Sequence, residues 1–498
     1  MVKKCFTGLG LGLIACAVAL LLWHQGALTG FEHATWQWRV AHFARPTPAT
    51  SRLRIIALDQ KSLDWGRKEN GLSWPWPRQA YATVLAFCKR AGVRAVAFDV
   101  LFSEPSLHGV ADDEAFALAM RENGPVVLSY TLAPPGEMFA AGESRPPVLT
   151  ISGLAQWLAK SRAPVLPQAV TMPVVELAGS AAMLANISNR PDPDGVFRRA
   201  PLFINLAGQP VPSLALAAYL AGAPGLAPLS LKENHLQVGE LGVPLDGAGQ
   251  AILNFRGVSR TVPTISLAAV VQSELQLEAG ETPVLDPAQL KDAYVFLGMT
   301  APGLYDLRAI PIDGVYPGVE IHATMLDNLL SQDFLRDSPI WLAAALTLFF
   351  GMLAAVTVIF CRTAWQSSLA FVLLLPLPFG AGFIAYRQGV WLPVAVQATA
   401  VLLALVSGVV FNFATEGRKK RYIKRAFSQY LHPTVIDQLV ANPERLRLGG
   451  EKRELSIFFS DLAGFTGMSE RLDPERLTLL LNEYLSAMTD IILESGGT

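Results

Sequence analysis

The residues best suited to chemistry lie in the segment FFSDLAGFT, residues 458–466. Asp461 follows an apolar run, Leu455–Phe459, that predicts a short β-strand, and Gly464 stands in the small-residue turn behind it. Glycine adopts backbone conformations that side chains forbid, so this turn can place backbone N–H groups beside a ligand. A carboxylate next to such groups suits a divalent metal ion that carries a triphosphate. The same pattern also fits an aspartate that only caps the turn.

A helix is expected to follow this turn. Asp473 is predicted to cap it, with Pro474 at its first position, and Gly496 and Gly497 are predicted to end it. One strand and one helix cannot bury their own apolar faces, so the segment is expected to be part of a larger domain. The apolar residues of the helix recur at helical spacing and predict one buried stripe: Leu477, Leu480, Leu481, Tyr484, Leu485, Met488, Ile491 and Ile492.

The middle of the chain shows the pattern of an α/β domain. Arg54–Asp59 and Ala95–Val100 are near-continuous apolar runs of buried-strand length. Between them, Gln79–Ala91 has the apolar spacing of an amphipathic helix, and this strand, helix, strand unit predicts a mostly parallel sheet. Tyr294–Thr300 predicts a further strand, and a helix is expected over 317–330.

Several polar residues of this region have two interpretations. Asp59 and Asp99 stand at strand ends, where α/β sheets place ligand contacts, and turn capping explains them equally well. His322 is expected to be a packed or hydrogen-bonded core histidine rather than a catalytic base. The carboxylates of DDEAF (112–116) favour a helix start over a metal site. Cys88 is the only cysteine of the middle region, so we expect a small buried apolar residue and no disulfide.

Composition predicts membrane spans, because hydrophobic residues make up 51% of the chain and charged residues only 16%. A net charge of −1 indicates no basic surface of the kind that binds nucleic acid, so no nucleic-acid partner is expected. For the first apolar segment a cleaved signal peptide is the alternative, and Pro376, Pro378 and Pro393 are expected to kink or delimit the last two. Four segments are long enough to cross a bilayer: 6–23, 340–360, 369–386 and 390–414.

Basic residues predict the orientation of these spans. Lys3 and Lys4 precede the first, Arg362 follows the second, and RKKRYIKR (418–425) follows the fourth. By the positive-inside rule both termini are then cytoplasmic, and the long region between the first two spans lies outside. A multi-pass protein of the bacterial inner (plasma) membrane is expected.

Residues 416–450 form the expected cytoplasmic linker. Ile423, Phe427, Tyr430 and Leu431 fall on one stripe of a basic helix. Two roles are open for it: a helix that lies on anionic membrane lipid, or a transmission helix that forms a dimer.

Five motifs of the middle region occur in an order that resembles a known family: ALDQKSL, SWPWPRQAYATVL, AVAFDVLFSEPS, NRPDPDGVFRRAPL and GVYPGVEIHATMLDNLL. They look like the extracellular CHASE-type sensor domain, second class, over residues 31–338. The resemblance implies an extracytoplasmic receptor module placed before membrane spans and a cytoplasmic output domain. It identifies no ligand, so the stimulus is unknown.

Residues 451–498 resemble the opening of a class III nucleotidyl cyclase domain. The resemblance implies that Asp461 is the first of two metal-binding aspartates and that the backbone carbonyl of Leu462 contacts a metal ion. It also implies two Mg²⁺ or Mn²⁺ ions, a homodimer with the site between its subunits, and ATP, or less commonly GTP, as substrate. It assigns the substrate phosphates to three residues: Gly464, Phe465 and Thr466.

We therefore expect a multi-domain chain with membrane helices, an extracytoplasmic α/β sensor domain and the beginning of an α+β (ferredoxin-like) cyclase domain. The leading hypothesis is a transmembrane sensor-cyclase that makes a 3',5'-cyclic nucleotide and pyrophosphate. The family's second metal aspartate would lie beyond Thr498, so the printed sequence is expected to be an incomplete, inactive piece of a longer cyclase. The alternative is a non-enzymatic membrane receptor or assembly protein whose cytoplasmic stub only dimerises.

Overall fold

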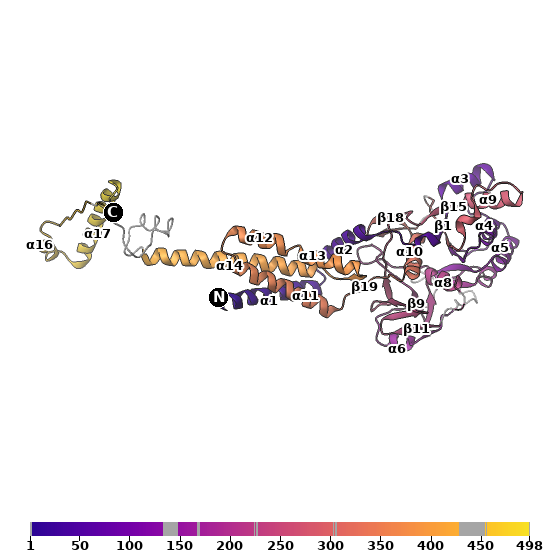
Figure 1. Cartoon of the computed structure of the whole chain (residues 1–498), viewed down its shortest axis with the longest axis horizontal. Coiled ribbons are helices and arrows are strands. Elements are labelled where there is room, and N and C mark those ends of the chain that lie inside the picture. Colours follow the sequence, from indigo (N-terminus) through magenta and orange to yellow (C-terminus); the bar gives the residue numbers. More distant parts are fainter. Residues whose placement is uncertain are drawn as a thin grey trace. The chain divides into compact units, whose positions relative to one another are not determined.

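The chain divides into two compact units, Met1–Glu416 and Gly417–Thr498, and each is described by itself. Figure 1 shows the ribbon in a computed structural model of the protein. Backbone alone is described at 165 and 416–427. The structure describes residues 2–132, 148–166, 170–223, 225, 228–301, 303, 306–427, 454 and 456–497.

We call residues 31–338 the outer domain, after the location that the sequence predicts for them. A mostly parallel sheet forms its centre, as the sequence predicts. Its main path runs β15-β1-β16-β2-β3-β6, and β7 also pairs with β3. All of these pairings are parallel except that of β6 with β3. Strand β16 lies between β1 and β2, which the local pattern did not indicate. The strands are β1 (Leu53–Leu58), β2 (Ala95–Asp99), β3 (Val126–Leu132), β6 (Val170–Thr171), β7 (Met183–Asn186), β15 (Thr264–Ser266) and β16 (Tyr294–Met299).

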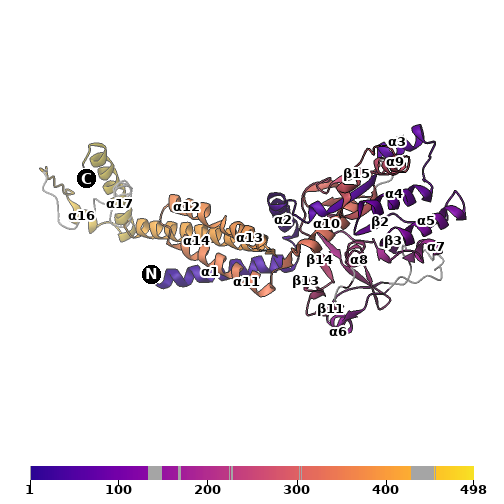
Figure 2. The ribbon, with the colours of Figure 1, turned by 45° about the vertical axis from the view of Figure 1, so that its right-hand side comes forward.

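Helices cover both faces of this sheet (Figure 2). On one face lie α4 (Arg78–Ala91), α5 (Val110–Glu122) and α9 (Leu267–Glu278), which share one apolar core with the sheet. On the other lie α8 (Leu214–Ala221) and α10 (Gly318–Ser331). The predicted helices 79–91 and 317–330 are confirmed as α4 and α10, and Cys88 is buried as expected.

Shorter elements complete the outer domain. Four small sheets have the orders β10-β9-β5, β13-β12-β11-β4, β14-β8 and β17-β18. Their strands are β4 (Ile151–Ser152), β5 (Val165–Leu166), β8 (Arg199–Pro201), β9 (Phe203–Leu206), β10 (Gln209–Pro212), β11 (Leu229–Lys232), β12 (His235–Val238), β13 (Leu241–Pro244), β14 (Gln250–Ile252), β17 (Leu307–Ile310) and β18 (Asp313–Pro317). The short helices are η1 (Thr50–Arg52), α3 (Gln60–Glu69), α6 (Leu154–Leu158), α7 (Val175–Ala178) and η2 (Pro287–Leu290).

Gly298 of β16 lets α10 approach the sheet. A Cβ atom at this position would lie 2.6 Å from the Cβ of Val319 in the first turn of α10. Gly298→Ala is therefore expected to push α10 away and to destabilise the outer domain by about 1–3 kcal/mol. The measurement is thermal unfolding of the whole chain in detergent. Gly314→Ala is the matched control, because a Cβ there meets no atom within 4 Å, and equal melting temperatures for the two variants would contradict the prediction.

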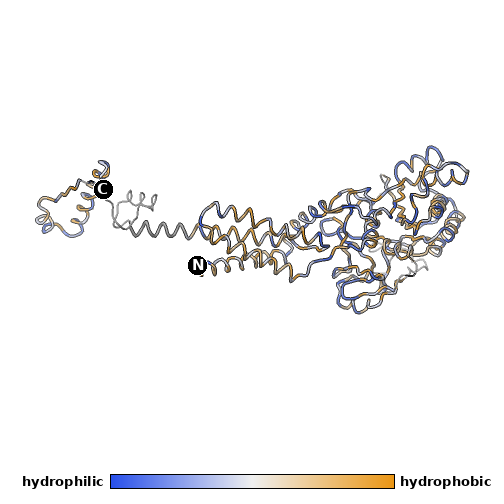
Figure 3. Tube along the Cα trace, viewed as in Figure 1, coloured by the Kyte–Doolittle hydropathy of each residue, from blue (hydrophilic) through white to orange (hydrophobic). Residues whose placement is uncertain are grey.

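Among the described residues, four helical segments are long and apolar enough to cross a membrane. They are Val2–His24, Ile340–Phe360, Ala364–Arg387 and Ala395–Thr415. Figure 3 colours the chain by residue hydropathy, and hydrophobic colours predominate in these segments. The helices are α1 (Val2–His24), α11 (Ile340–Phe360), α12 (Ala364–Leu374), α13 (Leu377–Arg387) and α14 (Ala395–Phe427).

The last two spans differ from their expected bounds. The segment expected as 369–386 consists of two helices, α12 and α13, which separate next to Pro376. Proline lacks the N–H that an uninterrupted helix needs, so the break has a local cause. The segment expected from residue 390 begins instead as β20 (Val390–Trp391), which pairs with β19 (Arg336–Asp337), and α14 starts at Ala395.

Helices α1 and α11 pack closely through small residues. A Cβ atom at Gly8 or Gly12 would lie 3.2 or 3.1 Å from the Cα atom of Val356 or Met352, respectively. Glycines four residues apart let two membrane helices bring their backbones together. This contact joins the first apolar helical segment directly to the second.

The second unit contains α16 (Phe465–Ser469) and α17 (Pro474–Glu494). Asp473 caps α17 as predicted, since its side chain accepts from the N–H groups of Glu475 and Arg476. The strand expected over 455–459 is wrong for its described residues, 456–459, which have no regular structure because no described segment pairs with them. The stripe expected to be buried on α17 is also wrong, since no residue of this helix is buried. Tyr430 and Leu431 of the predicted linker stripe lie outside the described residues, as do the side chains of Ile423 and Phe427.

Candidate functional site

A cavity of about 510 Å³ opens at the carboxyl edge of the parallel sheet. Open α/β sheets bind ligands at this edge. The ends of β2, β3 and β16, the segment that follows β7, residues 306 and 308, and the first turns of α10 contribute to its walls. Its lining residues are Asp99, Val100, Leu101, Thr131, Ile187, Ser188, Asn189, Met299, Asp306, Arg308, Gly318, Val319 and His322.

Asp99 is one of two aspartates that line this cavity. It ends β2 and is partly buried, and among the described residues no hydrogen bond reaches its carboxyl group. Burial is the main cause that raises the pKa of Asp99, the nearby charge of Asp306 adds to it and Arg308 opposes both, which gives a net pKa of about 7. Of its two sequence interpretations, the structure therefore favours a ligand contact over a turn cap. Asp59 is the opposite case, because its carboxylate caps α3 by accepting from the N–H of Ser62 at 2.8 Å.

Asp306 and Arg308 form an ion pair at the edge of the same cavity. The guanidinium Nε of Arg308 donates to Oδ2 of Asp306 at 2.7 Å, and the Arg308 side chain also lies over the ring of Phe197. Asp306 lies close to the start of α10: a Cβ atom at Gly318 would be 2.9 Å from its Oδ2. The positive charge of Arg308 is thus already matched within the protein.

His322 lines the cavity from α10 and is only 8% exposed. Its Nδ1 atom is buried without a hydrogen-bond partner among the described residues. Burial is the main cause that lowers the pKa of His322 and the charge of Arg308 adds to it, which gives a net pKa of about 4, so the ring is neutral near pH 7. The expectation that His322 is packed in the core is confirmed. The alternative, a hydrogen-bonded histidine, is not observed among the described residues.

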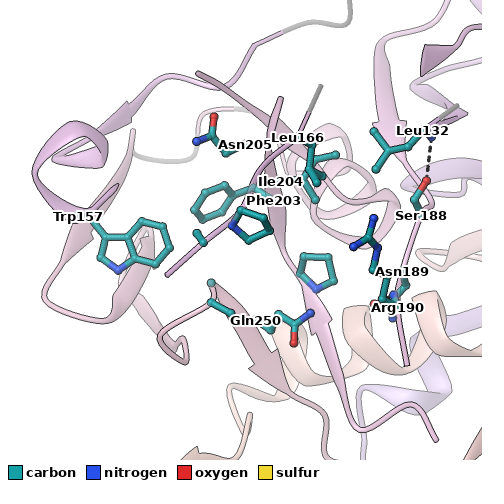
Figure 4. Close-up of a pocket in the computed structure, with 15 residues that line it drawn as sticks. Leu132, Trp157, Leu166, Ser188, Asn189, Arg190, Phe203, Ile204, Asn205 and Gln250 are labelled. Carbon is teal, nitrogen blue, oxygen red and sulfur yellow. Dashed lines mark hydrogen bonds between the residues drawn. The ribbon is translucent and has the colours of Figure 1, made fainter. Parts of the chain in front are cut away.

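A second cavity, of about 170 Å³, shares Ser188 and Asn189 with the first (Figure 4). Its walls are mainly apolar and include Trp157 and Phe203. The side-chain amide of Asn205 has no partner among the described residues, and its atoms are shielded from the cavity as well as from solvent. This space therefore presents little polar chemistry to a ligand.

A buried ion pair ties α2 (Thr29–Phe43) to the start of α14. Arg39 donates from Nη2 to Oε1 of Glu32 at 2.6 Å and from Nη1 to the carbonyl of Leu392 at 2.9 Å. The other oxygen of Glu32 accepts from the backbone N–H groups of Val394 and Ala395 at 2.7 and 2.8 Å. Glu32 therefore caps α14, where its charge also complements the helix dipole. We call Glu32, Arg39 and their partners on 391–395 the junction.

Trp391 of β20 connects the junction to the outer domain. Its indole N–H donates to Glu32 at 3.1 Å, and its ring centroid lies 4.0 Å from that of Trp36. On the other side, the guanidinium of Arg199 lies 4.8 Å over the Trp391 ring and donates twice to Asp337 of β19 at 3.0 Å. Arg199 of the outer domain thus contacts both strands, β19 through Asp337 and β20 through Trp391.

Helix α10 connects the cavity with the segment that leads to β19. Its first turns line the cavity, and Asp327 near its end accepts from Nε of Arg256 at 2.7 Å. Arg256 also donates to both carboxylate oxygens of Asp333, at 2.8 and 2.6 Å. Asp333 lies in the chain between α10 and β19, so Arg256 holds the segment that leads to β19 against the last turn of α10.

The residues singled out in the second unit lie in one exposed turn. Oδ1 of Asp461 accepts from the N–H of Leu462 at 2.9 Å, and the carbonyl of Leu462 accepts from the N–H of Phe465 at 3.2 Å. Gly464 takes the left-handed conformation, φ +78°, at the start of α16, and the carbonyl of Thr466 accepts from Ser469 at 2.9 Å. Within the described ranges no group of three or more His, Cys, Asp or Glu side chains is placed to hold a metal ion. One carboxylate does not fit a site for two ions.

The sequence model of the CHASE2 domain matches residues 13–358. The chain belongs to the CHASE2 domain family. CHASE2 is an extracellular sensor domain, and the match reaches from α1 through the whole outer domain into α11. No solved structure matches the chain.

One curated relative of this CHASE2 protein is an adenylate cyclase of Anabaena cylindrica, which is 30% identical over 78 residues. The aligned part covers 16% of this chain and 14% of that relative.

Sequence reasoning missed two pairs of residues in the CHASE2 protein. Glu32 and Arg39 lie seven residues apart on one helix face just behind a span, which was the available signal. Asp306 and Arg308 carried only the weak signal of charges after a strand and a turn. In both cases the other groups of the site come from distant parts of the chain: residues 392–395 for the first pair and Asp99 for the second.

Asp99 is expected to make the stability of the CHASE2 domain depend on pH. Its pKa is raised in the folded state, from 3.8 to about 7, so its stabilising contribution is present below pH 4 and is lost as the pH rises through 7. Asp99→Asn removes this loss and is expected to raise the melting temperature more at pH 8 than at pH 5, by the equivalent of about 1–3 kcal/mol. Asp292→Asn, at a side chain 64% exposed, is the control that should show no such difference. Parallel pH profiles for wild type and Asp99→Asn would contradict the assignment.

Proposed function

We propose that this chain carries the sensor, membrane and transmission parts of a sensor-linked nucleotidyl cyclase. The observation that carries the proposal is the junction, in which Glu32 caps the helix that continues toward the cytoplasmic unit. A receptor needs such a physical connection between its sensor and its output. The CHASE2 match supports the sensor. The partial resemblance to a protein named adenylate cyclase supports the proposed output.

The proposed topology places the CHASE2 domain outside a bacterial plasma membrane and both termini in the cytoplasm. Four apolar helical segments among the described residues are compatible with it. The basic residues Lys3, Lys4 and Arg362 and the run 418–425 favour this orientation over the reverse.

Signal transmission follows from the contacts. A ligand that binds better to one position of α10 shifts the population toward that position. Because Arg256 holds Asp327 and Asp333, the shift reaches β19 and β20, and Trp391 passes it to Glu32 at the start of α14. Packed interfaces of this kind switch between discrete arrangements instead of deforming continuously.

The proposed output is formation of a cyclic nucleotide from ATP, or less commonly GTP, by a homodimer. In this proposal Asp461 and the carbonyl of Leu462 bind Mg²⁺ or Mn²⁺, and Gly464, Phe465 and Thr466 face the substrate phosphates. The described residues supply one carboxylate there, so we assign no catalytic step to this segment.

Membranes that contain the full-length gene product provide the test. With Mg²⁺ or Mn²⁺ present, we expect cyclic AMP from ATP, with GTP as the second substrate to be assayed. Formation of neither cyclic nucleotide would contradict the cyclase and favour a non-enzymatic receptor. Protease digestion of right-side-out vesicles checks the topology, since the CHASE2 domain should be cleaved and residues 456–497 protected.

A further inference from the structure

The charges around the large cavity do not balance. Asp99 and Asp306 contribute two carboxyl groups, and Arg308 contributes one guanidinium, which donates to Asp306. His322 is buried and neutral near pH 7. Among the described residues, Asp99 is left without a cation and without a hydrogen-bond donor. A partly buried carboxylate in this condition is costly, and a positively charged ligand removes the cost.

The ligand that matches Asp99 is not a metal ion. Metal ions in proteins take several ligands, and no group of three or more candidate side chains is assembled in the described part of the chain. A single carboxylate is sufficient for an organic cation, because a charge-assisted hydrogen bond needs only one acceptor.

The rest of the cavity favours a small organic molecule. Its volume of about 510 Å³ falls within the range of small-molecule sites. Leu101, Ile187 and Val319 offer apolar surface to a carbon skeleton, and Thr131 and Ser188 add hydroxyl groups on one wall. The ring of His322 also lines the cavity, but its Nδ1 atom is shielded from the cavity as well as from solvent.

We propose that this cavity binds an aliphatic primary amine, whose ammonium group donates hydrogen bonds to the carboxylate of Asp99. The inference rests on the proposed sensor role of the CHASE2 domain and names the class of its ligand. Because α10 forms one wall of the cavity, an occupant of this size is placed to change the position of α10 and hence the junction.

Binding is expected to depend on pH through Asp99. The charged groups that face it are Asp306, Arg308 and, when protonated, His322. The ammonium ligand needs the ionised form of Asp99, whose pKa lies at about 7, while the amine itself stays protonated. The dissociation constant should therefore rise about tenfold from pH 8 to pH 6.

The experiment measures binding of putrescine and butylamine to the whole chain in nanodiscs, by calorimetry and by the shift in melting temperature. 1,4-Butanediol is the neutral control, because it replaces both ammonium groups of putrescine by hydroxyl groups. We expect the amines to bind and the diol to bind at least tenfold more weakly. Asp99→Asn should weaken amine binding at least tenfold at pH 8, and Asp292→Asn should leave it unchanged.

Three results would overturn the inference: no binding of either amine at 10 mM, equal binding of putrescine and the diol, or unchanged amine binding by Asp99→Asn. The diol comparison uses the wild-type chain, so it is valid even if the variant folds poorly. Binding is measured without any cyclase assay. Amine binding without cyclic-nucleotide formation would contradict the proposed output alone, and the converse would contradict the ligand assignment alone.

Discussion

Asp461→Asn is expected to lower cyclic-nucleotide formation by the full-length protein by at least roughly a hundredfold. In the proposed function this carboxylate holds a divalent ion against the substrate phosphates. Asparagine has nearly the same shape and lacks the charge that a hard cation requires. The assay is the initial rate of cyclic AMP formation in membranes at saturating ATP and Mn²⁺.

The matched control for this variant is Glu483→Gln, which makes the same chemical change on the exposed surface of α17. It should retain near wild-type activity. Both proteins should insert into the membrane in equal amounts, because residue 461 lies outside the four apolar helical segments. An Asp461→Asn protein with wild-type activity would exclude the proposed role of this turn, even if the protein were a cyclase.

The sheet of the outer domain was predictable where the signal is local. Strand β1, helix α4 and strand β2 each bury a face whose apolar residues are close in sequence, such as Val84, Leu85 and Cys88 on α4. Apolar residues that recur at the helical period lie on one face of the helix, and that face is the one that packs on the core. The periodicity in the sequence therefore indicates which face is buried. The insertion of β16 between β1 and β2 depends on contacts over about two hundred residues, which no local pattern contains.

The candidate site was predictable only in part, for the same reason. Asp99 could be singled out because strand ends in α/β sheets meet at one edge. Whether it caps a turn or faces a cavity depends on Arg308, His322 and the first turns of α10, which come from a different part of the chain. The junction is a stronger case, since Glu32 and Val394 are 362 residues apart.

Residues 456–459 show the limit of strand prediction. The apolar run has strand composition, but a strand is defined by hydrogen bonds to a partner, and none of the described segments pairs with it. Phe458 and Phe459 are exposed as a result. The apolar pattern therefore indicates a preference for strand structure, and a strand forms only where another segment pairs with it.

Arg39→Met is expected to destabilise the junction by about 3–5 kcal/mol, because it leaves the charge of Glu32 buried without its cation. The side chains are almost fully buried, 1% exposed for Arg39 and 9% for Glu32, so water cannot replace the lost partner. The N–H groups of Val394 and Ala395 should then exchange faster, since the carboxylate that accepts from them is no longer held in place. Hydrogen exchange of the peptide that covers 392–398 measures this directly.

Two further variants separate the ion pair from general damage to the fold. Arg45→Met makes the same change at an exposed position shortly after α2 and should leave the exchange unaltered. The double variant Glu32→Gln/Arg39→Met removes both charges and should recover part of the loss, because no unpaired charge then remains buried. If the junction transmits the signal, Arg39→Met should still bind putrescine at Asp99 while losing the response of cyclic-nucleotide formation to it. A variant that keeps that full response would show that the route from α10 to α14 does not pass through Glu32.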